Sequence, residues 1–206
     1  MDPSALLVPL ALVAMAYCKL RRAPMRGGAD SDWTEAMDAI ASGIRDSCGE
    51  SIVFTEDIDE TACCVCNATL SSYEALVRSM DDMMTYYIPA PDGATRSIVV
   101  CAYDVEDDEV TVHLVCSNPK VPRLPGITFH LLMYALCDIK MRHAGVPIKL
   151  KLSNDPRAQK LYESLGFGCP GGLGHECDLD DVKFEDIVGR LVAGKHVEAA
   201  NSEPLQ

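Results

Sequence analysis

The segment Arg123–Thr128, which reads RLPGIT, has the residue types of an anion-binding loop. It stands where an apolar strand-like stretch gives way to a long stretch of helical apolar spacing. Backbone N–H groups at a helix N-terminus attract anions, helped by the helix dipole. Gly126, Ile127 and Thr128 would supply such groups, and Arg123 either adds charge or is an ordinary surface cation. The segment therefore predicts a helix N-terminus that is suited to an anion.

The elements that must position this loop are indicated by apolar periodicity and turn residues. Strands are expected over residues 96–105 and 109–117, joined by an acidic turn at 106–108. A loop over 118–125 then leads into a helix over 126–143, whose apolar residues recur at helical spacing. This order predicts an antiparallel hairpin that delivers the chain to the loop.

The elements after the loop are a strand and a short helix. Ile148, Leu150 and Leu152 alternate as a strand, and Asp155-Pro156 opens a helix over 157–165. Strand, loop, helix, strand and helix in this order predict a mixed α/β fold with one parallel crossover.

The first half of the chain gives weaker signals. A helix through residue 48, capped by Ser31 or Asp32, is expected, followed by a short strand over 51–55. A second helix is expected to start at Ser71 or Ser72 and to carry a stripe of apolar residues that ends in Met80, Met83 and Met84.

Residues 152–167, LSNDPRAQKLYESLGF, closely resemble the carboxy-terminal motif of the GNAT superfamily of N-acetyltransferases. Arg123–Thr128 is similar to the family's acetyl-CoA pyrophosphate signature and stands at the expected junction. The resemblance covers roughly residues 96–168 and implies a GNAT fold, in which helices flank a mixed, mostly antiparallel sheet. It also implies acetyl-CoA as the acyl donor. The matching motif positions are Asn154, Ala158, Leu161, Tyr162, Glu163, Leu165, Gly166 and Phe167.

The resemblance further implies where the donor lies. In the family the strand before the loop splays from the next strand, and the pantetheine arm pairs with it as a missing strand would. Here Leu114, Val115 and Cys116 would present those backbone groups, and Asn154 belongs to the same donor site. One strand amide would polarise the thioester carbonyl, as an oxyanion hole does.

Proton transfer needs an acid and a base, because the amine must lose a proton and the departing thiolate must gain one. Tyr162 occupies the position where similar enzymes place the general acid, or it is simply a helix tyrosine packed on the sheet. His113 is the preferred base because an imidazole titrates in the required range. Glu109 and Asp104, acting through water, are the alternatives.

The loop departs from the family pattern at three positions. Leu124 and Pro125 stand where small flexible residues are usual, and proline removes one amide that could bind phosphate. Proline also suits the start of a helix. Thr128 replaces Gly or Ala, so its hydroxyl is expected either to bond to the pyrophosphate or to crowd it.

The resemblance implies an N-acetyltransferase that moves an acetyl group from acetyl-CoA to a primary amine by direct attack on the thioester. The acceptor is expected to be an amine-bearing small molecule or a protein or peptide. The alternative is a GNAT-fold protein without catalysis that serves as a membrane-anchored structural or interaction protein. The loop departures and the unassigned base favour the alternative.

The net charge of −13 over 206 residues argues against nucleic-acid binding, which requires a basic face. A cationic partner is compatible with this charge, and so is simple solubility. No metal is expected, because no cysteine and histidine spacing matches a zinc site.

The ten cysteines are expected to be reduced, which would place the domain in a reducing compartment. Cys101, Cys116 and Cys137 fall within apolar patterns, where cysteine acts as a small buried hydrophobe. Cys169 with Cys177 and the run at 63–66 lack standard ligand spacing. A thiol or metal module built on Cys63, Cys64 and Cys66 is a third, weaker interpretation.

Residues 5–18, ALLVPLALVAMAYC, carry no charge and are followed by basic residues at 19–26. A membrane anchor over residues 5–20 is expected, with the domain on the cytoplasmic side because basic residues stay there. A cleaved signal peptide remains open, since residues 14–16 resemble a cleavage site. A helix packed on the domain is a third interpretation, although the stretch has no polar face.

The expected organisation follows from these segments. Residues 1–20 form the anchor or signal, 21–32 a linker, 33–195 the GNAT domain and 196–206 a flexible tail. An amphipathic helix around 182–192 is expected either to shape the acceptor pocket or to form a homodimer contact.

Overall fold

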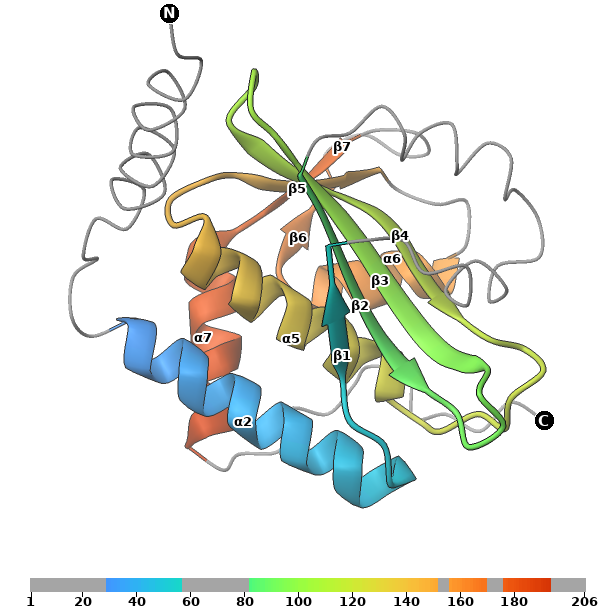
Figure 1. Cartoon of the computed structure of the whole chain (residues 1–206). Helices are drawn as coiled ribbons and strands as arrows, with labels where there is room; N and C mark the ends of the chain where they lie inside the picture. The colour runs from blue at the N-terminus through green and yellow to red at the C-terminus, as the bar shows by residue number, and fades with distance from the viewer. Residues whose placement is uncertain (1–28, 57–81, 152–155, 170–175, 194–206) are drawn as a thin grey trace, which may run out of the picture. The chain divides into compact units, whose positions relative to one another are not determined.

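The computed structural model describes residues 29–56, 82–151, 156–169 and 176–193 (Figure 1). The compact unit that contains the sheet begins at Asp32. The described helices and strands are α2 (Ala29–Cys48), β1 (Val53–Thr55), β2 (Asp82–Pro89), β3 (Thr95–Asp104), β4 (Glu109–Ser117), α5 (Ile127–Arg142), β5 (Ile148–Lys151), α6 (Pro156–Ser164), β6 (Phe167–Gly168), β7 (Glu176–Leu179) and α7 (Asp181–Val192).

The described strands form one sheet in the order β1-β2-β3-β4-β5-β7-β6. Neighbouring strands run antiparallel except β4 and β5, which run parallel. The chain reaches β5 from β4 through α5, which is the connection that a parallel pair needs. The mixed, mostly antiparallel sheet and its single parallel crossover confirm the fold class expected from the sequence.

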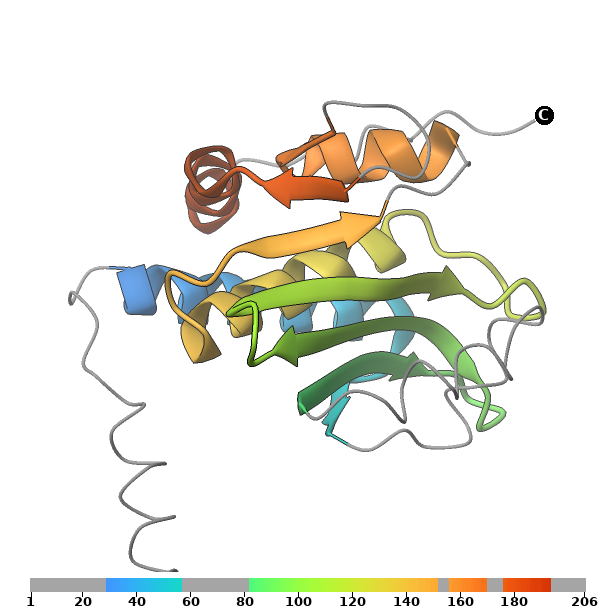
Figure 2. The ribbon, with the colours of Figure 1, turned by 90° about the horizontal axis from the view of Figure 1, so that it is seen from above.

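Helices α2 and α5 lie on the same face of the sheet (Figure 2). In α2 the buried residues Trp33, Ala36, Ile40 and Ile44 recur at intervals of three and four, so they form one apolar stripe. Trp33 stacks on Phe184 of α7, with ring centroids 5.6 Å apart. Helix α5 is buried on most of its circumference because it lies between the sheet and these helices.

The expected helix around 182–192 is α7, and its apolar side faces the core. Phe184, Ile187 and Val188 are buried there, and the Asp180 side chain caps the helix by accepting from the Lys183 amide. Because this apolar side is already covered, the helix does not offer it for a dimer contact.

A polar group in the core ties β2 to α5. The Tyr86 hydroxyl donates to Asp138 Oδ2 at 2.8 Å, and Arg142 Nε donates to the same oxygen at 2.7 Å. The Arg142 guanidinium also lies over the Phe54 ring, 4.3 Å from its centroid. Burial, with the neighbouring Asp138 charge, raises the pKa of Tyr86, so this phenol stays a proton donor.

We expect Asp138→Ala to lower the free energy of unfolding by about 2–4 kcal/mol, because it leaves a buried hydroxyl and a guanidinium without their acceptor. Asp138→Asn keeps one acceptor oxygen, so its free energy of unfolding should fall by about half as much. Urea denaturation measures both values, and Glu185→Ala on the exposed side of α7 is the control. Equal stability of Asp138→Ala and the control would show that the group contributes nothing.

The sequence predicted a helix from residue 71 or 72 through Met84, and this prediction is wrong for Met83 and Met84, the part that the structure describes. Met83 and Met84 lie in strand β2, which continues to Pro89. Residues 83–86 are buried without alternation, as in a strand covered on both faces, and such a run cannot be told from a buried helix by period alone. Residues 57–81, which include the rest of that predicted helix, lie outside the described residues.

The expectation that the cysteines are reduced is also wrong. Cys169 and Cys177 form a disulfide, with Cα atoms 4.4 Å apart, and Cys116 is disulfide-bonded too. Gly168 pairs with Asp178, so the antiparallel register places Cys169 directly opposite Cys177. Strands β6 and β7, too short to be predicted, create this juxtaposition.

Other cysteines match the expectation. Cys101 and Cys137 are free and fully buried, and burial raises the pKa of both thiols. They behave as small hydrophobes in the core. Cys63, Cys64 and Cys66 lie outside the described residues.

The expected anchor at residues 5–20 and the tail at 196–206 lie outside the described residues as well. None of the helices within the described ranges is long and apolar enough to cross a membrane. The domain boundaries at residues 20, 32 and 195 therefore stay predictions.

Candidate functional site

Strands β4 and β5 pair over only three residues and then separate (Figure 2). Val110, Thr111 and Val112 pair with Ile148, Lys149 and Leu150. On its other side β4 stays paired with β3 to Ser117, but the register shifts where Val100 pairs with Leu114 and Cys101 with Val112. His113 is thus the extra residue of a bulge in β4, and such bulges redirect a strand.

Beyond the bulge, one edge of β4 has no strand beside it in the described part of the chain. Leu114, Val115 and Cys116 keep their pairs on β3, so the backbone groups that point away from β3 face the opening toward β5. Unpaired N–H and C=O groups of an edge can pair with an extended ligand. The three residues that the family resemblance assigns to binding of the acyl donor therefore lie along an open edge.

The N-terminus of α5 follows this edge through the loop 118–126. Gly126 is its N-cap residue, at φ 74° and ψ −7°, and no described side chain caps the helix. The Ile127 amide already donates to the Leu124 carbonyl at 3.3 Å. The amides of Gly126, Thr128 and Phe129 have no acceptor among the described residues, so these three are the ones available to an anion.

This corrects the sequence assignment of the amides in one respect. Ile127 is occupied by the turn that Leu124 and Pro125 form, whereas Phe129, which sequence reasoning omitted, is available. The first turn of α5 contains no acidic residue, and its last turn contains Lys140 and Arg142. An anion at the N-terminus therefore meets the favourable end of the dipole without a competing carboxylate.

The Thr128 side chain is turned toward the strands. Its Oγ1 lies 3.0 Å from Ser97 Oγ and 2.5 Å from Ser117 Oγ, and Ser97 Oγ also donates to the Cys116 carbonyl at 3.0 Å. These hydroxyls join the first turn of α5 to β3 and β4. Sequence reasoning missed Ser97 and Ser117, because their positions depend on strand register.

We expect Thr128→Val to lower the free energy of unfolding by about 1 kcal/mol, because two hydroxyls lose a shared partner. Thr128→Ser keeps the hydroxyl and should restore most of the loss. Thermal unfolding of the two variants beside the wild type measures the difference. Equal melting of Thr128→Val and the wild type would contradict a structural role for this cluster.

His130 lies over the loop, although the sequence did not single it out. A methyl group built on Gly126 would lie 3.5 Å from His130 Cε1, so the imidazole is in contact range of the glycine. Burial lowers the pKa of His130, which leaves the ring neutral at pH 7. The ring therefore shapes the mouth of the site without adding charge to it.

Tyr162, the candidate acid, lies on α6 and is 7% exposed. Its ring meets Phe167 edge to face, with centroids 6.1 Å apart. The side chain is packed at the edge of the core, so solvent reaches little of it. Asn154 lies outside the described residues.

The candidate bases are placed in different parts of the hairpin. His113 is half-buried at the bulge. Asp104 caps the turn between β3 and β4 by accepting from the amides of Glu106 and Asp107, and Glu109 forms an ion pair with Lys149 at 2.5 Å. Glu109 is four residues from His113 along the strand, about 13 Å. The structure thus brings only His113 to the opening, while Arg123 is exposed on the loop.

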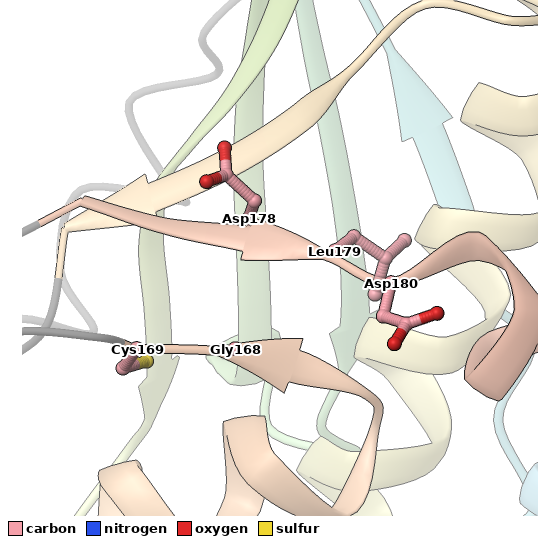
Figure 3. A pocket seen from close by; sticks show the side chains of 5 residues that line it. All are labelled: Gly168, Cys169, Asp178, Leu179 and Asp180. Carbon is pink, nitrogen blue, oxygen red and sulfur yellow. The ribbon is translucent and has the colours of Figure 1, made fainter.

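A separate hollow of about 440 Å³ lies at the β6 edge of the sheet (Figure 3). It is lined by β6, β7 and the residues beside them: Gly168, Cys169, Asp178, Leu179 and Asp180. Asp180 caps α7 and pairs with Lys183 at 3.4 Å, so this carboxylate has a structural use. No residue of β4 or α5 lines the hollow, and it is distinct from the opening beside β4.

Comparison with solved structures identifies the fold. An acyl-CoA N-acyltransferase from Pseudomonas aeruginosa aligns at 14% identity and a TM-score of 0.50, over 64% of this chain and 99% of that one. A Bacillus subtilis acetyltransferase in complex with CoA aligns at 16% identity and a TM-score of 0.50, over 64% and 98%.

Nourseothricin acetyltransferase shares 22% identity at a TM-score of 0.40, over 47% of this chain and 64% of its own length, a likeness too distant to say more. No family model and no curated protein sequence matches the chain. The two closer alignments show that the chain has the GNAT fold over the segment that aligns.

Proposed function

We propose that this GNAT-fold chain is an acyltransferase that moves an acetyl group from acetyl-CoA to a primary amine. The observation that carries the proposal is the open edge of β4 beside the uncapped N-terminus of α5. An extended thioester arm suits the edge, and a diphosphate suits the amides of Gly126, Thr128 and Phe129. The Bacillus subtilis protein of the same fold was solved with CoA, which supports this choice of donor.

The proposed chemistry is direct transfer. The amine nitrogen attacks the thioester carbonyl, the C–S bond breaks, and an amide and the free thiol of CoA result. Tyr162 gives its proton to the departing thiolate, and His113 accepts the proton that the amine loses. A backbone N–H near the β4 bulge stabilises the carbonyl oxygen as it gains charge.

A panel of primary amines, including small molecules, polyamines and peptides, tests the activity by release of the CoA thiol. Acetylation of one class of amine above the rate without acceptor is the expected result. Calorimetric titration with acetyl-CoA tests donor binding separately. Absence of binding by the folded chain would remove the proposal.

A catalytically inactive GNAT-fold scaffold is the second candidate. The burial of Tyr162, which leaves it 7% exposed, and the proline in the loop favour this function. A scaffold would bind acetyl-CoA or leave it unbound, but it would acetylate no amine in the panel.

We also propose that residues 5–20 attach the domain to a membrane, on the cytoplasmic side that the basic residues after them favour. The Cys169–Cys177 disulfide favours an oxidising compartment instead. Fractionation of cells that express the full chain, followed by protease treatment of sealed vesicles, tests attachment and side together. Recovery of the protein in the wash of the membranes would contradict attachment. Protection of the domain from a protease added on the cytoplasmic side would contradict the proposed side.

A further inference from the structure

Arg96, near the start of β3, is a buried cation that forms no ion pair with any described residue. It is 9% exposed, and its Nη1 donates to the Pro122 carbonyl at 2.7 Å. Its buried Nε has no hydrogen-bond partner within the described ranges. A buried charge is costly unless an opposite charge compensates it. The position therefore suits an anion that arrives with a ligand.

The residues on either side of Arg96 hold the same loop. The Asn118 side chain donates to the Thr95 carbonyl at 2.9 Å, and the Asn118 amide donates to the Arg96 carbonyl at 2.9 Å. Ser97 bonds to Thr128 at the far end of the loop, as described above. Three consecutive residues of β3 thus fix the beginning, the middle and the end of the chain from Asn118 to Thr128.

We propose that Arg96 makes the site select an acyl donor that carries a diphosphate over the same pantetheine arm without one. The inference rests on the proposed function and adds the residue that determines donor class. Arg96 acts through the loop: its bond to Pro122 holds the backbone in the shape that presents the amides of Gly126, Thr128 and Phe129. Its charge, shielded from water, attracts an anion there more strongly than an exposed cation such as Arg123 does.

Competition against a fluorescent CoA tests the proposal on the full chain, with CoA and pantetheine as the competing ligands. Arg96→Met should raise the inhibition constant of CoA about tenfold, because it removes both the bond that holds the loop at Pro122 and the buried charge. The inhibition constant of pantetheine should stay within about twofold. Arg96→Lys keeps the charge but has a shorter reach, so it should raise the inhibition constant of CoA by a smaller factor. Arg45→Met, on the exposed side of α2, removes one positive charge elsewhere and should change neither constant.

The outcomes separate the two proposals. Failure of the wild type to bind CoA removes both of them. Two results overturn the role of Arg96 and leave the proposed function intact. In the first, the wild type binds CoA and Arg96→Met binds it with the same affinity. In the second, Arg96→Met loses affinity for CoA and for pantetheine by the same factor. If Arg96→Met does not fold, Arg96→Lys decides: an unchanged ratio of the two constants overturns the inference, and a lower preference for CoA supports it.

Discussion

Gly126→Val is expected to weaken CoA binding about a hundredfold, which corresponds to about 2.7 kcal/mol. Gly126 has φ 74°, a conformation that a β-branched residue adopts only with strain. A β-carbon there would also stand 3.5 Å from His130 Cε1, so the larger valine side chain crowds the loop at the imidazole. Both effects act on the loop, so the loss should appear in binding. Calorimetric titration with CoA measures it.

Gly145→Val is a matched control for that variant. Gly145 has φ 75°, lies just beyond the other end of α5, and has open space where a side chain would stand. It carries the same backbone strain of about 1–2 kcal/mol and should lower stability by a similar amount. CoA affinity should stay within about twofold of the wild type. Equal losses of affinity in both variants would mean that strain alone, and not the position of Gly126, accounts for the effect.

Tyr162→Phe is expected to lower the turnover number about a hundredfold, the usual contribution of a general acid. The dissociation constant for acetyl-CoA should stay unchanged, because the ring and its contact with Phe167 remain. The rate is measured by release of the CoA thiol with the best amine of the panel.

Tyr134→Phe removes a phenol hydroxyl from a half-buried tyrosine on α5 and is the control. It should leave turnover unchanged. Full activity of Tyr162→Phe would assign this residue to packing alone and would leave the acid unidentified. Lack of acetylation by both variants and by the wild type would favour the scaffold.

Much of the second half of the fold could be predicted because local chemistry specified it. Pro125 and Gly126 mark the start of α5, the regular apolar spacing marks its length, and Asp155-Pro156 marks the next helix. The motif around Tyr162 fixed the family resemblance. The residues that make up each of these signals are close together in the sequence, so the signals can be recognised without knowing which strands pair.

The features that sequence reasoning missed depend on residues far apart in the chain. The bulge at His113 exists only in the register between β3 and β4, and the contacts of Ser97 and Arg96 with the loop cross 26 to 31 residues. The Cys169–Cys177 disulfide follows from the pairing of two very short strands. Strand β2 was misread because burial on both faces removes the alternation that identifies a strand.

Backbone amide chemical shifts of the full chain, recorded with and without CoA, test the central claim most directly. We predict that the largest shifts fall on Gly126, Thr128 and Phe129 and on residues 114–116 of β4. Saturable binding that leaves both groups of amides unmoved, or that moves only the residues around Asp178, would contradict the site.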